Sequence, residues 1–271
     1  MKKLILFSLI LLSGFVLHAC SNETTSENNE YNEYNNEQIS EREAISFTSD
    51  SHGNFTVIES FWGFEGDRSN ILPIESATEL VVQYIYDVLG ETLNGKYLEM
   101  VFNYNPHISE RAWNAGVYAS SVGLGGDEGT GEGMIIVRIE AETGDRLTIA
   151  DMRVPFFGDE IAAIFDEFEE DISIENFIEE MSILFPIPTE DEIEEAHELA
   201  QTYFTRHFGQ DNVGDIHFGR FGEDLTLDYY EGSTALAFYI VDEDNVIQLA
   251  IKRKPLVFLS IDVHSVDFLN Q

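Results

Sequence analysis

Carboxylates are the commonest side chains in this sequence that could do chemistry. Its 271 residues include 51 Asp and Glu, 14 Lys and Arg, seven His and one Cys. A hydrolase that uses two carboxylates needs them to face each other across a cleft with separated pKa values, and Trp62 or Trp113 could form an aromatic wall of such a cleft. With so many acids the sequence does not single out the pair. A carboxylate-dependent hydrolase acting on cell-wall or extracellular polymer is therefore the alternative function.

The sequence lacks the motifs of other common catalytic and metal sites. It contains no GxSxG elbow and no HExxH motif, and His197, His207 and His217 do not have the spacing of zinc ligands. The glycine-rich segment 123–133 carries acids and no lysine, so we expect a flexible hairpin loop rather than a phosphate site. The turn at Asp242–Asn245 is too short for an EF-hand loop, although calcium-assisted adhesion or sensing is a further alternative. We predict no catalytic residue, no cofactor and no metal site, and hence a protein that is not an enzyme.

The charge of the chain limits the partners it can bind. A net charge of −37 excludes nucleic acid, because phosphate binding needs clustered Lys and Arg. The same charge repels anionic lipid headgroups and attracts polycations, divalent metals and basic protein faces. A simpler interpretation is that the acids only keep the protein soluble.

The single cysteine, Cys20, follows an apolar N-terminal segment. Lys2 and Lys3 precede the apolar run 4–17, which is shorter than the roughly 20 residues that a membrane span needs. A basic start followed by such a run is typical of a secretory signal. An exported protein with one thiol has no intramolecular disulfide partner for it. We therefore expect residues 1–19 to be a signal peptide.

The residues around Cys20 resemble the lipobox of bacterial lipoproteins. Leu17 lies three positions before the cysteine and Ala19 directly before it, while His18 departs from the small residue usual there. The resemblance implies that Cys20 is acylated on sulfur and becomes the mature N-terminus. Two or more acyl chains hold a protein stably at a bilayer. We expect a lipid-anchored protein at the cell membrane that faces outside the cytoplasm, at the cell surface or in the periplasm.

Composition and internal similarity divide the rest of the chain. Residues 20–54 are rich in Asn, Glu, Ser and Thr, so we expect a disordered tether, because such a segment buries too little apolar surface to offset the entropy of ordering. The segments beginning at Glu75 and Glu194 align without gaps, 119 residues apart, which indicates a duplicated module. The expected parts are a first module at 55–155, a helical linker at 156–188 and a second module at 189–271.

Each module is expected to begin with a helix. Ser76 with Glu79, and Thr189 with Glu192, have the spacing of capping boxes, and Gly90 and Gly209 suit the C-terminal ends. The expected strands are 97–104, 113–122, 134–140, 146–151, 215–221, 225–230, 235–241 and 246–251, and the expected linker helices contain 161–168 and 174–181. These patterns predict an α+β fold of two similar modules, each an amphipathic helix packed on a small antiparallel sheet, joined by short acidic helices.

Residues 133–151, "GMIIVRIEAETGDRLTIAD", resemble the hairpin of the PepSY module. Glu140 stands where that pattern usually has Asp, and Thr143 and Gly144 form the turn. The second hairpin, 236–251, has Asp244–Asn245 in place of Thr-Gly. The resemblance implies a module without catalytic residues that restrains or modulates a peptidase. We therefore expect a lipid-anchored extracytoplasmic binding or regulatory protein that modulates a peptidase or other envelope protein through a protein or peptide contact.

Overall fold

The structure of this chain is a computed structural model. It describes residues 44–49, 52–60, 70–105, 110–119, 134–154, 174–209, 213–222, 227–242 and 245–266. Several predictions fall outside these residues: the signal peptide, the lipidated Cys20, Trp62, the glycine-rich loop 123–133 and the linker helix at 161–168. None of the described helices combines the length and apolar character needed to cross a membrane.

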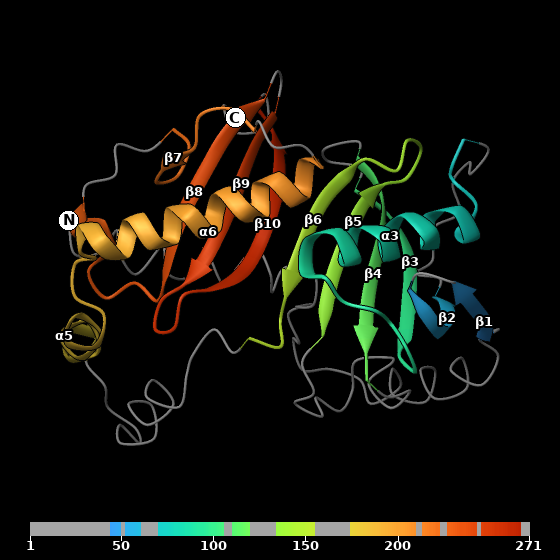
Figure 1. Ribbon diagram of the computed structural model, residues 1–271, viewed down its shortest axis with the longest axis horizontal. Helices are drawn as coiled ribbons and strands as arrows, with labels where there is room; N and C mark the ends of the chain where they lie inside the picture. The colour runs from blue at the N-terminus through green and yellow to red at the C-terminus, as the bar shows by residue number, and fades with distance from the viewer. Residues whose placement is uncertain are drawn as a thin grey trace, which may run out of the picture.

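The described strands form one ten-stranded mixed sheet (Figure 1). In sheet order they are β1 (Ala44–Ser49), β2 (Gly53–Ser60), β3 (Tyr97–Asn105), β4 (Glu110–Tyr118), β5 (Ile135–Glu140), β6 (Arg146–Asp151), β10 (Val257–Ser265), β9 (Asn245–Lys252), β8 (Ala235–Asp242) and β7 (His217–Phe218). Strands β2 and β3 are parallel, and the other neighbours are antiparallel.

The predicted fold of two modules with separate antiparallel sheets is therefore wrong. A helix followed by four strands does occur in each half of the chain, but the last strands of the halves, β6 and β10, pair with each other in the middle of the sheet. Each would otherwise leave a row of backbone N–H and C=O groups unpaired at a sheet edge. Pairing them satisfies both edges at once and merges the halves into one body.

Two long helices, α3 (Ile74–Leu89) and α6 (Glu190–Phe208), cover the same face of this sheet (Figure 1). Their apolar residues and the inward side chains of the strands form a single buried cluster. The members from the helices include Ala77, Val81, Tyr84, Ile85, Val88, Ala196, Ala200 and Phe204. The core thus lies on one side of the sheet and continues without a break across both halves.

Of the four helix ends predicted from the sequence, at Ser76, Gly90, Thr189 and Gly209, the structure confirms the last three. Gly90 and Gly209 have φ values of 71° and 67°, in the left-handed region that glycine adopts without strain. The Thr189 hydroxyl accepts a hydrogen bond from the Glu192 backbone N–H at 3.2 Å. The capping box predicted at Ser76 is wrong, because α3 already begins at Ile74.

The earlier start of α3 has a cause in the residue just before it. The Leu72 backbone N–H donates to the Ala141 carbonyl at 2.8 Å, and the Leu72 carbonyl accepts a bond from the Trp113 indole at 3.2 Å. Leu72 is therefore fixed against the sheet, and Pro73 follows with φ −55°. Helix α3 therefore begins at Ile74, shortly after the residue that is fixed to the sheet.

Three further segments differ from the expectations. Strand β1 lies within the range predicted as the tether, and its Phe47 ring stacks on Phe55 of β2. The expected strand at 225–230 contains a short 3-10 helix, Leu227–Tyr230. Helix α5 (Ile174–Leu184) does not join the halves: its Met181 and the nearby Phe185 form a small separate cluster, and it lies at the β7–β8 end of the sheet (Figure 1).

Candidate functional site

The sheet face opposite α3 and α6 carries a row of polar side chains. From β4 to β7 this polar row consists of Asn114, Arg138, Thr148, Asp262, Gln248, Tyr239 and His217, each paired in register with the next. Their sequence neighbours, such as Val137, Ile149 and Ile261, lie in the core under the helices. Because side chains alternate along a strand, the polar row must lie on the other face.

The polar row runs across both halves of the chain. Its seven positions are on adjacent strands, so at about 4.8 Å per strand it extends roughly 29 Å. None of the seven residues is classed as buried, and His217 is exposed. The two long helices, α3 and α6, leave this face uncovered, because both pack on the opposite one. The row is therefore a long polar surface with groups of both charge signs.

Asp262 lies at the middle of the polar row, on β10 at the junction of the two halves. Removal of water around its carboxyl group raises its pKa. His264 and Arg138 oppose this effect with positive charge, and the hydroxyls of Ser260 and Thr148 oppose it with hydrogen bonds. Because the pKa remains raised, the surroundings do not fully replace the water lost by the carboxylate. A desolvated carboxyl group in a polar surface row is a candidate binding residue.

A second carboxylate on the same face, Glu99 of β3, is also withdrawn from water. Its Oε1 accepts a hydrogen bond from the Ser60 hydroxyl at 2.5 Å and its Oε2 accepts one from the Tyr118 hydroxyl at 3.4 Å. Strands β4, β5 and β6 separate β3 from β10, which puts Glu99 and Asp262 at least about 19 Å apart. Catalytic carboxylates of glycoside hydrolases are roughly 5–9.5 Å apart, so these two cannot act as such a pair.

Trp113 does not form the wall of a cleft. It lies on the helix-covered face, 3% exposed, with its ring edge-on to Phe102 at a centroid distance of 5.7 Å. Its indole N–H is satisfied by the Leu72 carbonyl. The structure therefore assigns Trp113 to the core, and the aromatic wall suggested for it is wrong.

The histidines singled out from the sequence lie apart. His207 is buried between α6 and α3, His197 packs edge-on to Phe238, and His217 stacks on Tyr239 at a centroid distance of 4.9 Å. Within the described part of the chain, no three His, Cys, Asp or Glu side chains converge as metal ligands. A shallow hollow beside α6 brings together three glutamates, one histidine and one isoleucine: Glu190, Glu194, Glu198, His197 and Ile193.

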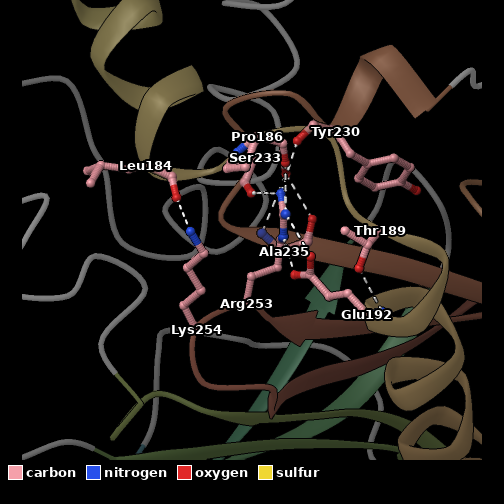
Figure 2. A network of polar contacts seen from close by, with 9 residues as sticks. All are labelled: Leu184, Pro186, Thr189, Glu192, Tyr230, Ser233, Ala235, Arg253 and Lys254. Atoms are coloured by element: carbon pink, nitrogen blue, oxygen red, sulfur yellow. Dashed lines mark hydrogen bonds and ion pairs between the residues drawn. The ribbon is translucent and has the colours of Figure 1, made fainter.

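Arg253, the most deeply buried cation among the described residues, has a structural role (Figure 2). Its side chain is 1% exposed, and its Nε and one terminal nitrogen donate to the two Glu192 oxygens at 2.6 and 2.9 Å. Its remaining bonds go to the carbonyls of Pro186, Tyr230 and Ser233 at 2.8–3.3 Å. All five guanidinium donors have partners, so none is left for a ligand. Arg253 fastens α6 and the segment before it to the loop between β9 and β10.

The residues that carry the PepSY resemblance build a tight turn. Glu140 Oε2 accepts hydrogen bonds from the backbone N–H groups of Glu142 and Thr143 at 2.7 and 2.5 Å. Gly144 has φ 80°, and a Cβ atom there would lie 2.3 Å from the Leu80 side chain. The acid closes the turn and the glycine lets it pack against α3. The predicted β5–β6 hairpin is confirmed, and its motif positions serve this turn.

Comparisons with known proteins leave the family open. No protein-family model matches the sequence, and no curated protein matches it. Among solved structures, the fold is similar to the Bacillus megaterium YpeB C-terminal domain, with a TM-score of 0.38 and 9% sequence identity. The similarity covers 74% of this chain and 66% of that one, slightly less than two thirds of its length. A likeness at this level carries no argument about function, and the PepSY resemblance remains a prediction.

Proposed function

We propose that this chain is a noncatalytic, lipid-anchored extracytoplasmic protein that binds a protein or peptide partner through the polar row and regulates it. The observation that carries the proposal is the row itself: a surface of about 29 Å that crosses both halves and has a desolvated carboxyl group at its centre. Such an extended, two-signed surface suits contact with a macromolecule.

Charge narrows the class of partner. The chain carries 51 acidic and 14 basic side chains, so its long-range field attracts a basic protein face and repels an acidic one. Arg138, Asp262 and His217 would then define the register of the complex through hydrogen bonds and charge pairs. Within this proposal the PepSY resemblance points to a peptidase or another envelope protein as the partner, and the lipid on Cys20 places both at the same membrane.

Site-specific photocrosslinking in cells that naturally produce the protein tests this proposal. A photoreactive amino acid replaces His217, which is exposed at the end of the polar row, or Thr202, which is exposed on the outer side of α6. We expect a discrete crosslinked protein with the His217 probe and none with the Thr202 probe. Equal or absent crosslinking at the two positions would overturn the proposed surface.

The anchor is tested in the same cells with a clickable fatty acid. We expect the chain to be labelled and recovered with membranes, and a Cys20→Ser variant to lose both the label and the membrane association. A wild-type chain that carries no fatty acid would overturn the anchor but leave the binding surface standing, because the two parts of the proposal rest on different residues.

A further inference from the structure

The C-terminal ends of α3 and α6 meet in a polar cluster with a buried centre, which we call the helix joint: Tyr84, Asp87, Arg146, Arg206 and His207. The Tyr84 hydroxyl, from α3, lies 2.9 Å from His207 Nδ1, from α6. Tyr84 is fully buried and His207 is 6% exposed. This hydrogen bond therefore links two helices that begin more than 100 residues apart in the sequence.

Arginines complete the helix joint by satisfying carbonyl groups at both helix ends. Arg146, from β6, donates to the carbonyls of His207 and Arg206 at 2.6 and 3.2 Å and to the Asp87 carboxylate. Arg206 donates to the Val88 carbonyl of α3 at 3.0 Å. The last carbonyls of a helix have no partner within the helix and carry partial negative charge. Each helix end is therefore held by a cation.

The protonation states in the helix joint follow from burial. Desolvation raises the pKa of Tyr84, only partly opposed by Arg146, so Tyr84 keeps its proton and can donate. Desolvation, aided by the charge of Arg146, lowers the pKa of His207 from 6.5 to about 4. His207 is therefore neutral at neutral pH, with Nδ1 as the acceptor and the proton on Nε2.

Other charges near His207 do not stabilise its protonated form. The helix dipole at the end of α6 would favour a cation, but Arg146 already occupies the carbonyls concerned. The Asp87 carboxylate is engaged by the same arginine. Asp262 acts on Tyr84 from β10 and raises its pKa further. Protonated His207 would thus be a second, desolvated cation beside Arg146.

We propose that the helix joint is an acid-sensitive latch, in which neutral His207 holds the ends of α3 and α6 together and protonation of His207 releases them while the sheet stays paired. The inference does not depend on the proposed partner. Release would loosen the helix cover near β6, which pairs with β10 where the two halves meet, without separating the strands.

The direction of the pH effect follows from the two states of His207. In the open joint the ring has the ordinary value of about 6.5, and in the closed joint it has a pKa of about 4. The closed joint is fully favoured above pH 6.5 and loses stability as the pH falls towards 4, because the open state then binds more protons. The loss in the closing equilibrium reaches roughly 300-fold.

Hydrogen exchange on the full chain between pH 7.5 and 4.5, normalised for intrinsic rates, tests the latch. His207→Asn is the matched variant, because its Oδ1 can accept the Tyr84 hydrogen bond but cannot be protonated. We expect protection of the last turns of α3 and α6 to fall by at least tenfold with acid in the wild type and to stay constant in His207→Asn. The amides of Leu249 and Ile251, in the core of strand β9, should stay protected in both chains.

Two results would overturn the latch. One is the same acid response in His207→Asn and wild type, and the other is simultaneous loss of protection in the helix ends and β9, which would mean global unfolding. If His207→Asn does not fold, NMR titration of the His207 ring in the wild type decides the question. A pKa near 4 in the folded chain supports the latch, and an ordinary value overturns it.

Discussion

Arg253 and Asp262 are both charged side chains largely withdrawn from water, and the protein compensates them to different degrees. Arg253 has a bidentate carboxylate and three carbonyl groups as partners. Asp262 has the charges of His264 and Arg138 and two neutral hydroxyls, and its pKa remains raised. A compensated buried charge holds elements together, whereas an under-compensated one reduces stability and persists where function needs it. This difference separates the structural network from the candidate site.

Removal of the compensated cation should have the largest effect. In Arg253→Met the Glu192 carboxylate and three carbonyl groups lose their donors, and we expect unfolding free energy to fall by about 3 kcal/mol, the lower part of the range for breaking a buried ion pair. The measurement is urea unfolding at pH 7. Arg206→Met is the control, because Arg206 is exposed and donates to one carbonyl. Equal losses in the two variants would contradict the structural role of Arg253.

Removal of the anion should cost less than removal of the cation. Glu192→Gln keeps one acceptor oxygen but turns an NH₂ group towards the guanidinium, so we expect a loss of about 1–3 kcal/mol. Glu194→Gln, an exposed change on the same helix, should alter the unfolding free energy by less than about 0.5 kcal/mol. If Glu192→Gln changes the unfolding free energy as little as Glu194→Gln does, the Arg253–Glu192 ion pair stabilises the protein no more than a surface contact would.

Local signals make part of this structure predictable from the sequence. The cap at Thr189, the left-handed Gly90 and Gly209 and the turn closed by Glu140 each depend on residues within a few positions. Hairpin β8–β9 is also predictable, because alternating apolar residues flank a short turn. Such features need no knowledge of distant contacts.

The single sheet and the polar row depend on contacts between residues far apart in the sequence. Strand β10 is absent from the predicted strands although residues 259–264 alternate between apolar and polar, since the bulge between Phe258 and Ser260 disturbs only its start. Without β10 the sequence does not indicate that the two halves share one sheet. It also does not reveal which side chains surround Asp262. The partners of Arg253 lie 20 to 67 residues away in the sequence. Its hydrogen bonds therefore could not be predicted from local sequence signals either.

Substitution of the under-compensated anion should give the smallest change in stability, and with the opposite sign. Asp262→Asn mimics the protonated carboxyl, so at neutral pH we expect the variant to be slightly more stable than the wild type. A raised pKa means that the native state holds the proton more tightly than the unfolded chain. The wild type therefore loses stability relative to Asp262→Asn as the pH rises above the unfolded value of about 3.9, until the folded carboxyl has ionised.

Urea unfolding of both chains at pH 5 and pH 8, with the exposed Asp228→Asn as control, measures this difference. The same variant tests the link to function: Asp262→Asn should lose the crosslink formed from position 217 although its fold is retained, because a residue kept at a cost to stability is expected to contribute to binding. If Asp262→Asn is instead less stable than wild type at pH 8, Asp262 is compensated as Arg253 is. Asp262 would then have a structural role, and the polar row would no longer contain an under-compensated carboxylate as its candidate binding residue.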